Sequence, residues 1–324
     1  MPADDLPRLP PRDPSGHKGT FGTVAVVGGC CTGGKAMLGA PALAALGALR
    51  AGAGLAKLVM PEPILPAALS ICPSATGIVL PVGSEGCLLA GEAPGVLDRV
   101  VGDAHALVIG PGLGDDPAAK ALCLRAVQQE SIPVIVDADA INALARVPEL
   151  FRDFRARAVL TPHPGEFRRL AGGLGISLDP TVPGSRPGAA EALAQRLGCI
   201  VVLKGAGTIV SDGHRTWTCQ RGHACLGTAG TGDVLGGVIA ALASQFSRDG
   251  DTGGPGPSRA GGPLPGRLSL FDAARVGVQA HAVAGELWAR RHASQAGLLA
   301  SELAELIPET LESMRSPGAQ QPAS

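Results

Sequence analysis

The apolar residues of the chain gather in short continuous runs that are separated by longer mixed stretches. Six runs are typical of β-strands, at 23–28, 55–60, 106–110, 133–138, 158–162 and 199–205. Consecutive rather than alternate positions are apolar in them, which predicts a sheet covered on both faces. Helical character marks the stretches between them, at 39–52, 117–129, 164–171 and 188–197. This order of strand and helix predicts an α/β fold with a mostly parallel sheet and helices on both faces.

The C-terminal third of the chain has a different pattern. Residues 208–219 are predicted to form a small hairpin with Asp212 and Gly213 at its turn. Three helices are predicted after it, at 232–246, about 270–291 and 299–313. The Gly- and Pro-rich residues 248–267 predict a disordered loop inserted between two of these helices. We expect flexible tails at 1–16 and 315–324 and, because nothing divides 17–314, a single domain there.

Composition argues against several classes of function. The 324 residues carry a net charge of −1, so we expect no nucleic acid or anionic membrane held by bulk charge. With no Tyr, six Phe and two Trp, the chain is poor in residues that stack on bases. Its longest uncharged stretches are shorter than the ~20 residues that cross a bilayer. The N-terminal residues lack the features of a secretory signal, and no C-x-x-C pair occurs among the eight cysteines. Reduced, buried thiols and a cytoplasmic location are therefore expected.

Ligands of an open α/β sheet bind beyond the carboxyl ends of its strands, so the residues that follow each strand are candidates for a site. Residues 29–35 match the P-loop pattern G-x-x-x-x-G-K, and 133–138 match the apolar run ending in Asp of a nucleotide hydrolase. A P-loop next needs Ser or Thr, where this chain has Ala36, so a plain Gly-rich turn is the alternative. The glycines in 110–114 either let a ligand approach the backbone or form an ordinary strand-to-helix turn.

Polar side chains follow three of the predicted strands. The first set either takes part in a site or caps the next helix: Asp137, Asp139 and Asn142. His163 lies between two prolines that stiffen its loop, and Glu166 follows in the first turn of a helix. Glu166 can order magnesium-bound water there, or be simply an acidic helix start. Lys204 precedes a Gly-rich turn that suits a nucleotide against the backbone; a solvated lysine in a hairpin is the alternative.

The segment 227–242 carries the strongest signal. Its glycines precede an apolar helix, whose free N–H groups at the N-terminus can hold a phosphate. Asp233 lies at the same terminus, where it either caps the helix or acts as general base for a hydroxyl that attacks a phosphoryl group.

Eight segments together resemble ADP- or ATP-dependent NAD(P)H-hydrate dehydratases, and they occur in the same order as in that family: KGTFGTVAVVGG, GAPALAALGALRAGAGL, VIGPGLG, DADAIN, LTPHPGEF, VVLKGAGT, AGTGDVLGGVIAAL and FDAARVGVQAHAVAGEL. The resemblance runs from about Lys18 to Leu306. It implies a ribokinase-like fold and the repair of NADH and NADPH whose nicotinamide ring has been hydrated. It also implies the stand-alone dehydratase, a homotetramer, and a separate epimerase that acts on the same metabolite.

The resemblance further implies that the S epimer is phosphorylated on its ring hydroxyl and then loses phosphate, with ADP or ATP as donor and with Mg²⁺. Asp233 would be the base and would contact the substrate, and Glu166 would organise the metal through water. The transferring phosphoryl group would lie against the backbone of Gly230, Thr231 and Gly232. The adenine nucleotide would be held by Gly232 together with Lys204, Gly205, Ala206, Gly207 and Thr208. The hydrated nucleotide would be lined by Ala40, Gly112 or Gly114, and His163.

The chain departs from the family pattern in two loops, and other functions compete. Met37 and Leu38 stand where the family usually has Tyr-Thr, and GHACLGT stands where it has a GNPGMAT-like segment. A ribokinase-like kinase of a small alcohol or vitamin precursor shares the segment ending in Asp233, but such kinases typically have Asn where His163 stands. A non-catalytic sensor of adenine nucleotides and a P-loop hydrolase are the remaining alternatives.

Overall fold

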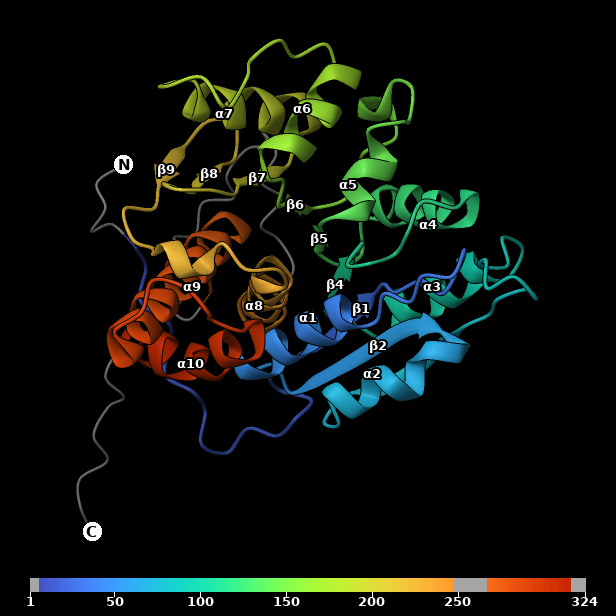
Figure 1. Cartoon of the computed structure of the whole chain (residues 1–324), viewed down its shortest axis with the longest axis horizontal. Helices are drawn as coiled ribbons and strands as arrows, with labels where there is room; N and C mark the ends of the chain where they lie inside the picture. The colour runs from blue at the N-terminus through green and yellow to red at the C-terminus, as the bar shows by residue number, and fades with distance from the viewer. Residues whose placement is uncertain (1–5, 248–266, 316–324) are drawn as a thin grey trace.

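One nine-stranded sheet crosses the whole domain in the order β3-β2-β1-β4-β5-β6-β7-β8-β9 (Figure 1). The computed structural model describes residues 6–247 and 267–315. The strands are β1 (Thr23–Val27), β2 (Leu55–Pro61), β3 (Thr76–Leu80), β4 (Ala106–Ile109), β5 (Val134–Val136), β6 (Ala158–Leu160), β7 (Ile200–Leu203), β8 (Ile209–Ser211) and β9 (Thr216–Thr218). Neighbours from β3 to β7 are parallel, and β8 and β9 add an antiparallel hairpin. The predicted α/β class and the six predicted strands are confirmed.

Helices cover both faces of the sheet. One apolar core joins the sheet to α1, α2, α8, α9 and α10, and a second core joins its other face to α3 through α7. Their bounds are α1 (Gly39–Arg50), α2 (Leu65–Ile71), α3 (Ala93–Gly102), α4 (Pro117–Gln128), α5 (Asp139–Leu144), α6 (Pro164–Gly173), α7 (Arg186–Leu197), α8 (Thr231–Phe246), α9 (Leu270–His292) and α10 (Ala300–Ser313). Short 3₁₀ turns lie at Glu62–Ile64, Leu150–Arg152 and Ala224–Leu226.

The strand β3 and the helices α2 and α3 were not among the predicted elements. β3 lies at the edge of the sheet, where Thr76, Gly77 and Val79 are exposed and only Leu80 is fully buried. An edge strand of this kind has no continuous apolar run, so the pattern that reveals the buried strands is missing from it.

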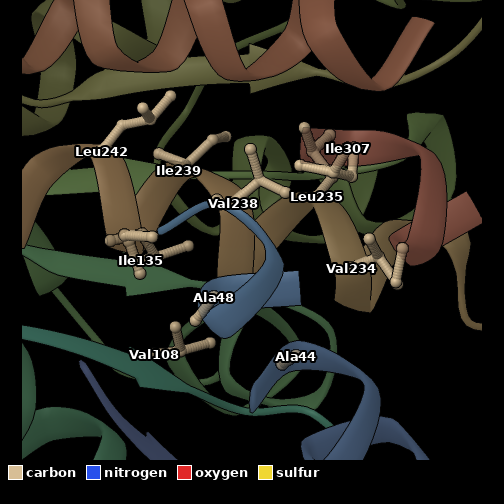
Figure 2. Packing of buried hydrophobic residues seen from close by; sticks show 14 of the residues in the cluster. Ala44, Ala48, Val108, Ile135, Val234, Leu235, Val238, Ile239, Leu242 and Ile307 are labelled. Carbon is tan, nitrogen blue, oxygen red and sulfur yellow. The ribbon is translucent and has the colours of Figure 1, made fainter. Parts of the chain in front are cut away.

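Helices α1 and α8 pack backbone against backbone through small residues. A Cβ atom added at Gly237 would lie 1.9 Å from the Ala44 carbonyl oxygen, and one added at Gly47 would lie 2.6 Å from the Val234 oxygen. Figure 2 shows Ala44 and Ala48 of α1 close to the apolar side chains at the start of α8. This contact sets how near the N-terminus of α8 comes to the carboxyl ends of the central strands.

Part of the predicted N-terminal tail lies against the domain. Leu9 is buried, and its N–H donates to the Met314 carbonyl oxygen at 2.9 Å. The Arg12 guanidinium stacks 3.5 Å from the centre of the Phe21 ring. Of the other expected flexible segments, 248–266 and 316–324 lie outside the described residues, as do residues 1–5.

The eight cysteines are all free thiols, and most are buried as expected. Cys87 is exposed, because it lies in the loop after the edge strand β3. Within the two described ranges, no helix combines the length and the apolar character that crossing a membrane requires.

The substitution Gly237→Ala is expected to destabilise the protein by about 1–3 kcal/mol, because the new methyl group forces α1 and α8 apart. Urea unfolding followed by circular dichroism measures this change. Gly172→Ala is the matched control: nothing lies within 4 Å of its added Cβ, and α6 gains helix propensity there. Equal stability of the two variants would show that the close packing of α1 on α8 is not a constraint.

Candidate active site

A buried ion pair lies at the carboxyl edge of the sheet, where β5, β6 and β7 end side by side. Asp137, directly after β5, is 1% exposed. Its Oδ1 accepts hydrogen bonds from Thr161 Oγ1 at 2.6 Å and from Lys204 Nζ at 2.8 Å. Thr161 and Lys204 are the residues that directly follow β6 and β7. The structure thus brings together Asp137 and Lys204, two of the candidate residues, and adds Thr161, which the sequence interpretation did not single out.

Lys204 is not the solvated lysine of the alternative interpretation. Its side chain is 20% exposed, and its backbone N–H donates to the Pro162 carbonyl oxygen at 2.9 Å. Burial opposes its charge, but the carboxylates of Asp137 and Glu166 outweigh burial and raise the pKa of Lys204. The ammonium group is therefore a fixed positive charge in the middle of the site.

The turn between β5 and α5 is held in an unusual backbone conformation. Ala138 has φ = 50°, a region that favours glycine, and it is the N-cap residue of α5 with no side-chain cap bond. A Cβ added at Gly110 would lie 1.9 Å from the Asp137 carbonyl oxygen, so only glycine fits beside this turn. Asp139 Oδ2 accepts the Gly114 N–H at 3.0 Å. Asp137 thus binds Thr161 and Lys204, and Asp139 binds the backbone of Gly114. Neither aspartate caps α5, so the cap alternative is wrong.

The N-terminus of α8 meets the ion pair. Gly230, with φ = 90°, is its N-cap residue, so Asp233 does not take the cap position. A Cβ added at Gly232 would lie 3.3 Å from Lys204 Nζ, which brings the first turn of α8 against the lysine. Burial raises the pKa of Asp233 to about 7, the charge of Asp137 acts in the same direction, and Lys204 opposes both. Asp233 is therefore poised to exchange a proton near neutral pH.

A half-buried histidine of α9 contacts this helix start. His281 Nε2 lies 2.9 Å from the Thr231 carbonyl oxygen, and burial lowers the pKa of His281 to about 4. The neutral ring therefore donates to this oxygen through Nε2–H. Thr231 Oγ1 in turn hydrogen-bonds the carbonyl oxygens of Leu226 and Thr228 at 2.9 and 2.8 Å. The sequence interpretation did not single out His281, which lies 50 residues further along the chain.

The start of α6 combines a helix cap with a buried carboxylate. His163 Nδ1 accepts the Gly165 N–H at 3.0 Å, and Glu166 Oε2 accepts the His163 N–H at 2.8 Å. Glu166 is nevertheless buried, and burial raises its pKa to about 7 against the influence of Lys204. The pKa of His163 is lowered by burial and by Lys204, which keeps the half-exposed ring neutral at pH 7. Glu166 is thus an acidic helix start, as one interpretation predicted, and it also brings a buried carboxyl group into the site.

The loop after β7 is glycine-rich and open to solvent. Gly205 and Gly207 have φ of 139° and 64°, and Thr208 Oγ1 donates to the Gly205 carbonyl oxygen at 2.9 Å. Arg186 Nη2 donates to the Leu203 carbonyl oxygen at 3.0 Å, which braces the loop from α7. The exposed backbone from Gly205 to Gly207 thus directly follows Lys204, whose ammonium group lies against the first turn of α8.

A pocket of about 860 Å³ has Asp139 in its wall. Its walls come from the segment after β1, the loop after β4, and the helices α5 and α6: Cys30, Thr32, Gly33, Lys35, Met37, Gly114, Asp115, Asp139, Asn142, Ala145, Arg146 and Arg169. Gly112 faces Met37, with 3.1 Å between its added Cβ and the Met37 Cβ, and Ala40 lies in the first turn of α1. Gly114 lines the pocket itself, whereas Gly112, Ala40 and His163 do not.

The segment after β1 does not form a P-loop. Residues 30–37 form a small hairpin closed by pairing of Cys30 with Met37, and α1 begins only at Gly39. Lys35 therefore lies on the hairpin, away from the start of the helix where a P-loop holds phosphate. The glycines and the lysine have the spacing of a P-loop, but the helix begins four residues after Lys35. The P-loop hydrolase interpretation is therefore wrong.

Comparison with known proteins places these features in a family. A family model described as NAD(P)H-hydrate dehydratase matches residues 24–309. The ATP-dependent (S)-NAD(P)H-hydrate dehydratase of Bos taurus is 37% identical over 263 residues, covering 79% of this chain and 73% of that protein. The chain spans about half the length of the bifunctional NAD(P)H-hydrate repair enzymes that it matches.

Solved structures show the same fold. The ADP/ATP-dependent NAD(P)H-hydrate dehydratase from Bacillus subtilis, co-crystallised with ATP and Mg²⁺, aligns with a TM-score of 0.71 and 27% identity over 97% of this chain and 100% of that one. A ribokinase-like superfamily protein from Enterococcus faecalis aligns with a TM-score of 0.71 at 23% identity, over 96% of this chain and 93% of that one. The predicted ribokinase-like fold is therefore confirmed.

The raised pKa of Asp233 predicts a pH-dependent effect of Asp233→Asn on stability. In the folded protein Asp233 holds its proton up to about pH 7, so its stabilising contribution is present at low pH and is lost as pH rises from about 4 to 7. The asparagine variant is expected to match wild type near pH 4 and to be more stable by roughly 1–3 kcal/mol at pH 8. Urea unfolding at both pH values measures this, with the exposed Glu130→Gln as control. A variant that is less stable than wild type at pH 8 would contradict the raised pKa.

Proposed function

Because this chain belongs to the NAD(P)H-hydrate dehydratase family, we propose that it uses ADP or ATP to dehydrate the S epimer of hydrated NADH and NADPH. The observation that carries the proposal is the position of Asp233. It is a half-buried carboxyl group with a pKa of about 7, in the first turn of a helix whose N-terminus is built from glycines and lies against Lys204. A proton acceptor and a phosphoryl-binding helix terminus thus occur at one place.

The reaction overcomes a poor leaving group. Hydroxide leaves badly because the pKa of water is about 15.7, whereas phosphate, with a second pKa of about 6, leaves far more easily. The ring hydroxyl attacks the terminal phosphoryl group of the nucleotide and loses its proton. The C–O bond then breaks, the lone pair of the ring nitrogen fills the electron deficit, and phosphate departs. Loss of a proton from the neighbouring ring carbon restores the reduced nicotinamide.

Each part of the site has a role in this scheme. Asp233 takes the proton from the ring hydroxyl, and the N–H groups of Gly230, Thr231 and Gly232 hold the transferring phosphoryl group. The loop Lys204–Thr208 holds the adenine nucleotide together with Gly232. The hydrated nucleotide lies along Ala40, Gly112, Gly114 and His163. The support for this division is that Gly232 lies against Lys204, whereas Gly114 lines the pocket on which Asp139 and Arg169 also lie.

We propose that Mg²⁺ accompanies the nucleotide. Among the described residues, no three His, Cys, Asp or Glu side chains are arranged to hold a metal ion on their own. The two carboxyl groups fit a hydrated ion instead, because desolvation raises the pKa of Glu166 and of Asp233 and a nearby cation would stabilise their charged forms. Glu166 would then contact the ion through water, and the nucleotide phosphates would supply its direct ligands. Bound Mg²⁺ would neutralise charge on the phosphates.

Three further features belong to this proposal. A homotetramer is expected from the family resemblance, and light scattering tests it. A cytoplasmic location agrees with eight free cysteines, since thiols persist in reducing compartments. A separate epimerase would supply the S epimer from the R epimer. The names of the bifunctional repair enzymes, of which this chain spans about half, support such a pairing of activities.

Incubation of purified protein with hydrated NADH or hydrated NADPH, Mg²⁺ and either ADP or ATP is expected to restore the near-ultraviolet absorbance of reduced nicotinamide. The faster of the two nucleotides identifies the phosphoryl donor, and the faster hydrate identifies the preferred substrate. Nucleotide binding without recovery of the absorbance would contradict the proposal and would favour a kinase of a small alcohol or a nucleotide sensor.

Asp233→Asn is expected to lower turnover at least ~100-fold while leaving nucleotide affinity unchanged, because it removes only the proton acceptor. In wild type, the turnover number should rise with pH to a plateau above about 7, since Asp233 must be ionised to accept the proton. The turnover number across pH 5–9 and calorimetry with ADP or ATP measure these effects. Asp98→Asn, an exposed aspartate paired with Arg125, is the control. Turnover of Asp233→Asn within tenfold of wild type would exclude Asp233 as the base.

A further inference from the structure

The pocket beside the carboxylate cluster has two positive side chains that its own carboxylates do not neutralise. Its charged lining residues are Lys35, Arg146, Arg169, Asp115 and Asp139. Both carboxylates are engaged: Asp115 pairs with Arg146 at 3.0 Å, and Asp139 accepts the Gly114 N–H at 3.0 Å. No carboxylate of the described chain lies within ion-pair distance of Lys35 or Arg169. The lining therefore offers two cations without an ion-pair partner among the described residues, and its charged side chains together carry a net charge of +1.

Arg169 is held in place for such a contact. Its Nε donates to Asn142 Oδ1 at 2.8 Å, which is a neutral partner and leaves the two Nη groups free for another acceptor. Arg169 follows Glu166 by one turn of α6, and its Nη1 lies 3.8 Å from a Cβ added at Gly165. Alongside the stronger effects of burial and Lys204, the charge of Arg169 lowers the pKa of His163. The guanidinium thus lies between the pocket and the active site.

Lys35 reaches the same pocket from a different element. It is exposed on the hairpin 30–37, whose ends are closed by the pairing of Cys30 with Met37. Gly33 and Gly34 have φ of 59° and 74°, and nothing lies within 4 Å of a Cβ added at either. The hairpin thus projects from the domain beside the pocket, and its lysine is free to move onto a ligand there.

We propose that Arg169 and Lys35 form an anion subsite that binds a phosphate group of the hydrated dinucleotide. The proposal rests on the proposed function, because it names the part of that substrate which lies outside the reaction centre. A guanidinium suits two oxygens of one phosphate, and a lysine adds a mobile point charge. A volume of about 860 Å³ is in the range of pockets that enclose a ligand of this size.

Electrostatics would give the substrate one orientation. The start of α8 is already assigned to the phosphoryl group of the nucleotide, and the carboxyl groups of Asp137, Glu166 and Asp233 disfavour a further phosphate there, whereas Arg169 and Lys35 attract the phosphates of the substrate. The neutral hydrated ring is therefore directed toward Asp233 and the phosphates toward the pocket. The two sources of a phosphate in the substrate are the pyrophosphate, present in both hydrates, and the 2′-phosphate, present only in hydrated NADPH.

The test compares Arg169→Gln, Lys35→Ala and the matched control Arg168→Gln, whose arginine precedes Arg169 on α6 and does not line the pocket. KM values for hydrated NADH and hydrated NADPH are measured at saturating nucleotide, and KM for ADP or ATP at saturating hydrate. Arg169→Gln and Lys35→Ala are expected to raise KM for a hydrate roughly tenfold or more, the usual effect of losing a charge-assisted hydrogen bond. The turnover number and KM for the nucleotide should stay within twofold, as should all values of Arg168→Gln. Arg169→Lys, which keeps the charge without the fork, should recover part of the loss.

Each result decides the proposal. A rise in KM for both hydrates assigns the pyrophosphate to the subsite, and a rise for hydrated NADPH alone assigns the 2′-phosphate. Unchanged KM for both hydrates, or an equal rise for the nucleotide, would overturn the subsite.

Failure of the proposed function is separable from failure of the subsite. If wild type dehydrates neither hydrate, calorimetry with NADP⁺, which carries the same phosphates, tests the subsite alone. Weaker binding to Arg169→Gln than to Arg168→Gln would support it, whereas equal affinity, or no binding by wild type, would overturn it.

Discussion

The ion pair between Lys204 and Asp137 is the interaction on which the candidate site depends. It joins the ends of β5 and β7 across the end of β6, where Thr161 completes the contact at 2.6 Å. A buried ion pair is weak evidence for stability, because desolvation of both charges offsets their attraction. The ion pair matters instead for the electrostatic field that it creates in the site. One fixed ammonium group faces Asp137, Glu166 and Asp233, and burial keeps the last two protonatable near neutral pH against its influence.

The second constraint is the close packing of α1 on α8. Glycine and alanine at this contact bring the two backbones together, so the start of α8 reaches the ion pair at the edge of the sheet. The positive end of the helix then lies beside a cluster of carboxylates, with His281 fixed behind it. Arg169 and Lys35 add positive charge to the pocket of about 860 Å³ that Asp139 also lines. The candidate site thus combines a cluster of carboxyl groups around Lys204 with a pocket lined by Arg169 and Lys35.

Several site residues were predictable because their chemistry is local. Gly230, Gly232 and Asp233 stand together in one segment, and a glycine-rich helix start is visible in any sequence that has one. Arg169 and His281 were not predictable in the same way. Each is an ordinary charged or polar residue on a helix, and its importance comes from a neighbour that is distant in the chain: Asn142 for one and the Thr231 carbonyl for the other.

The sequence by itself determined the α/β class, the six buried strands, the glycine-rich turns and the family, because these depend on short-range patterns of apolar residues and on motifs in order. Tertiary structure decided what those patterns leave open. Lys204 and Asp137 are 67 residues apart, and only the order of the strands makes them partners. The motif at 29–35 has the spacing of a P-loop, but the pairing of Cys30 with Met37 turns it into a hairpin. Charge, burial and pKa are properties of such long-range contacts, and local periodicity does not encode them.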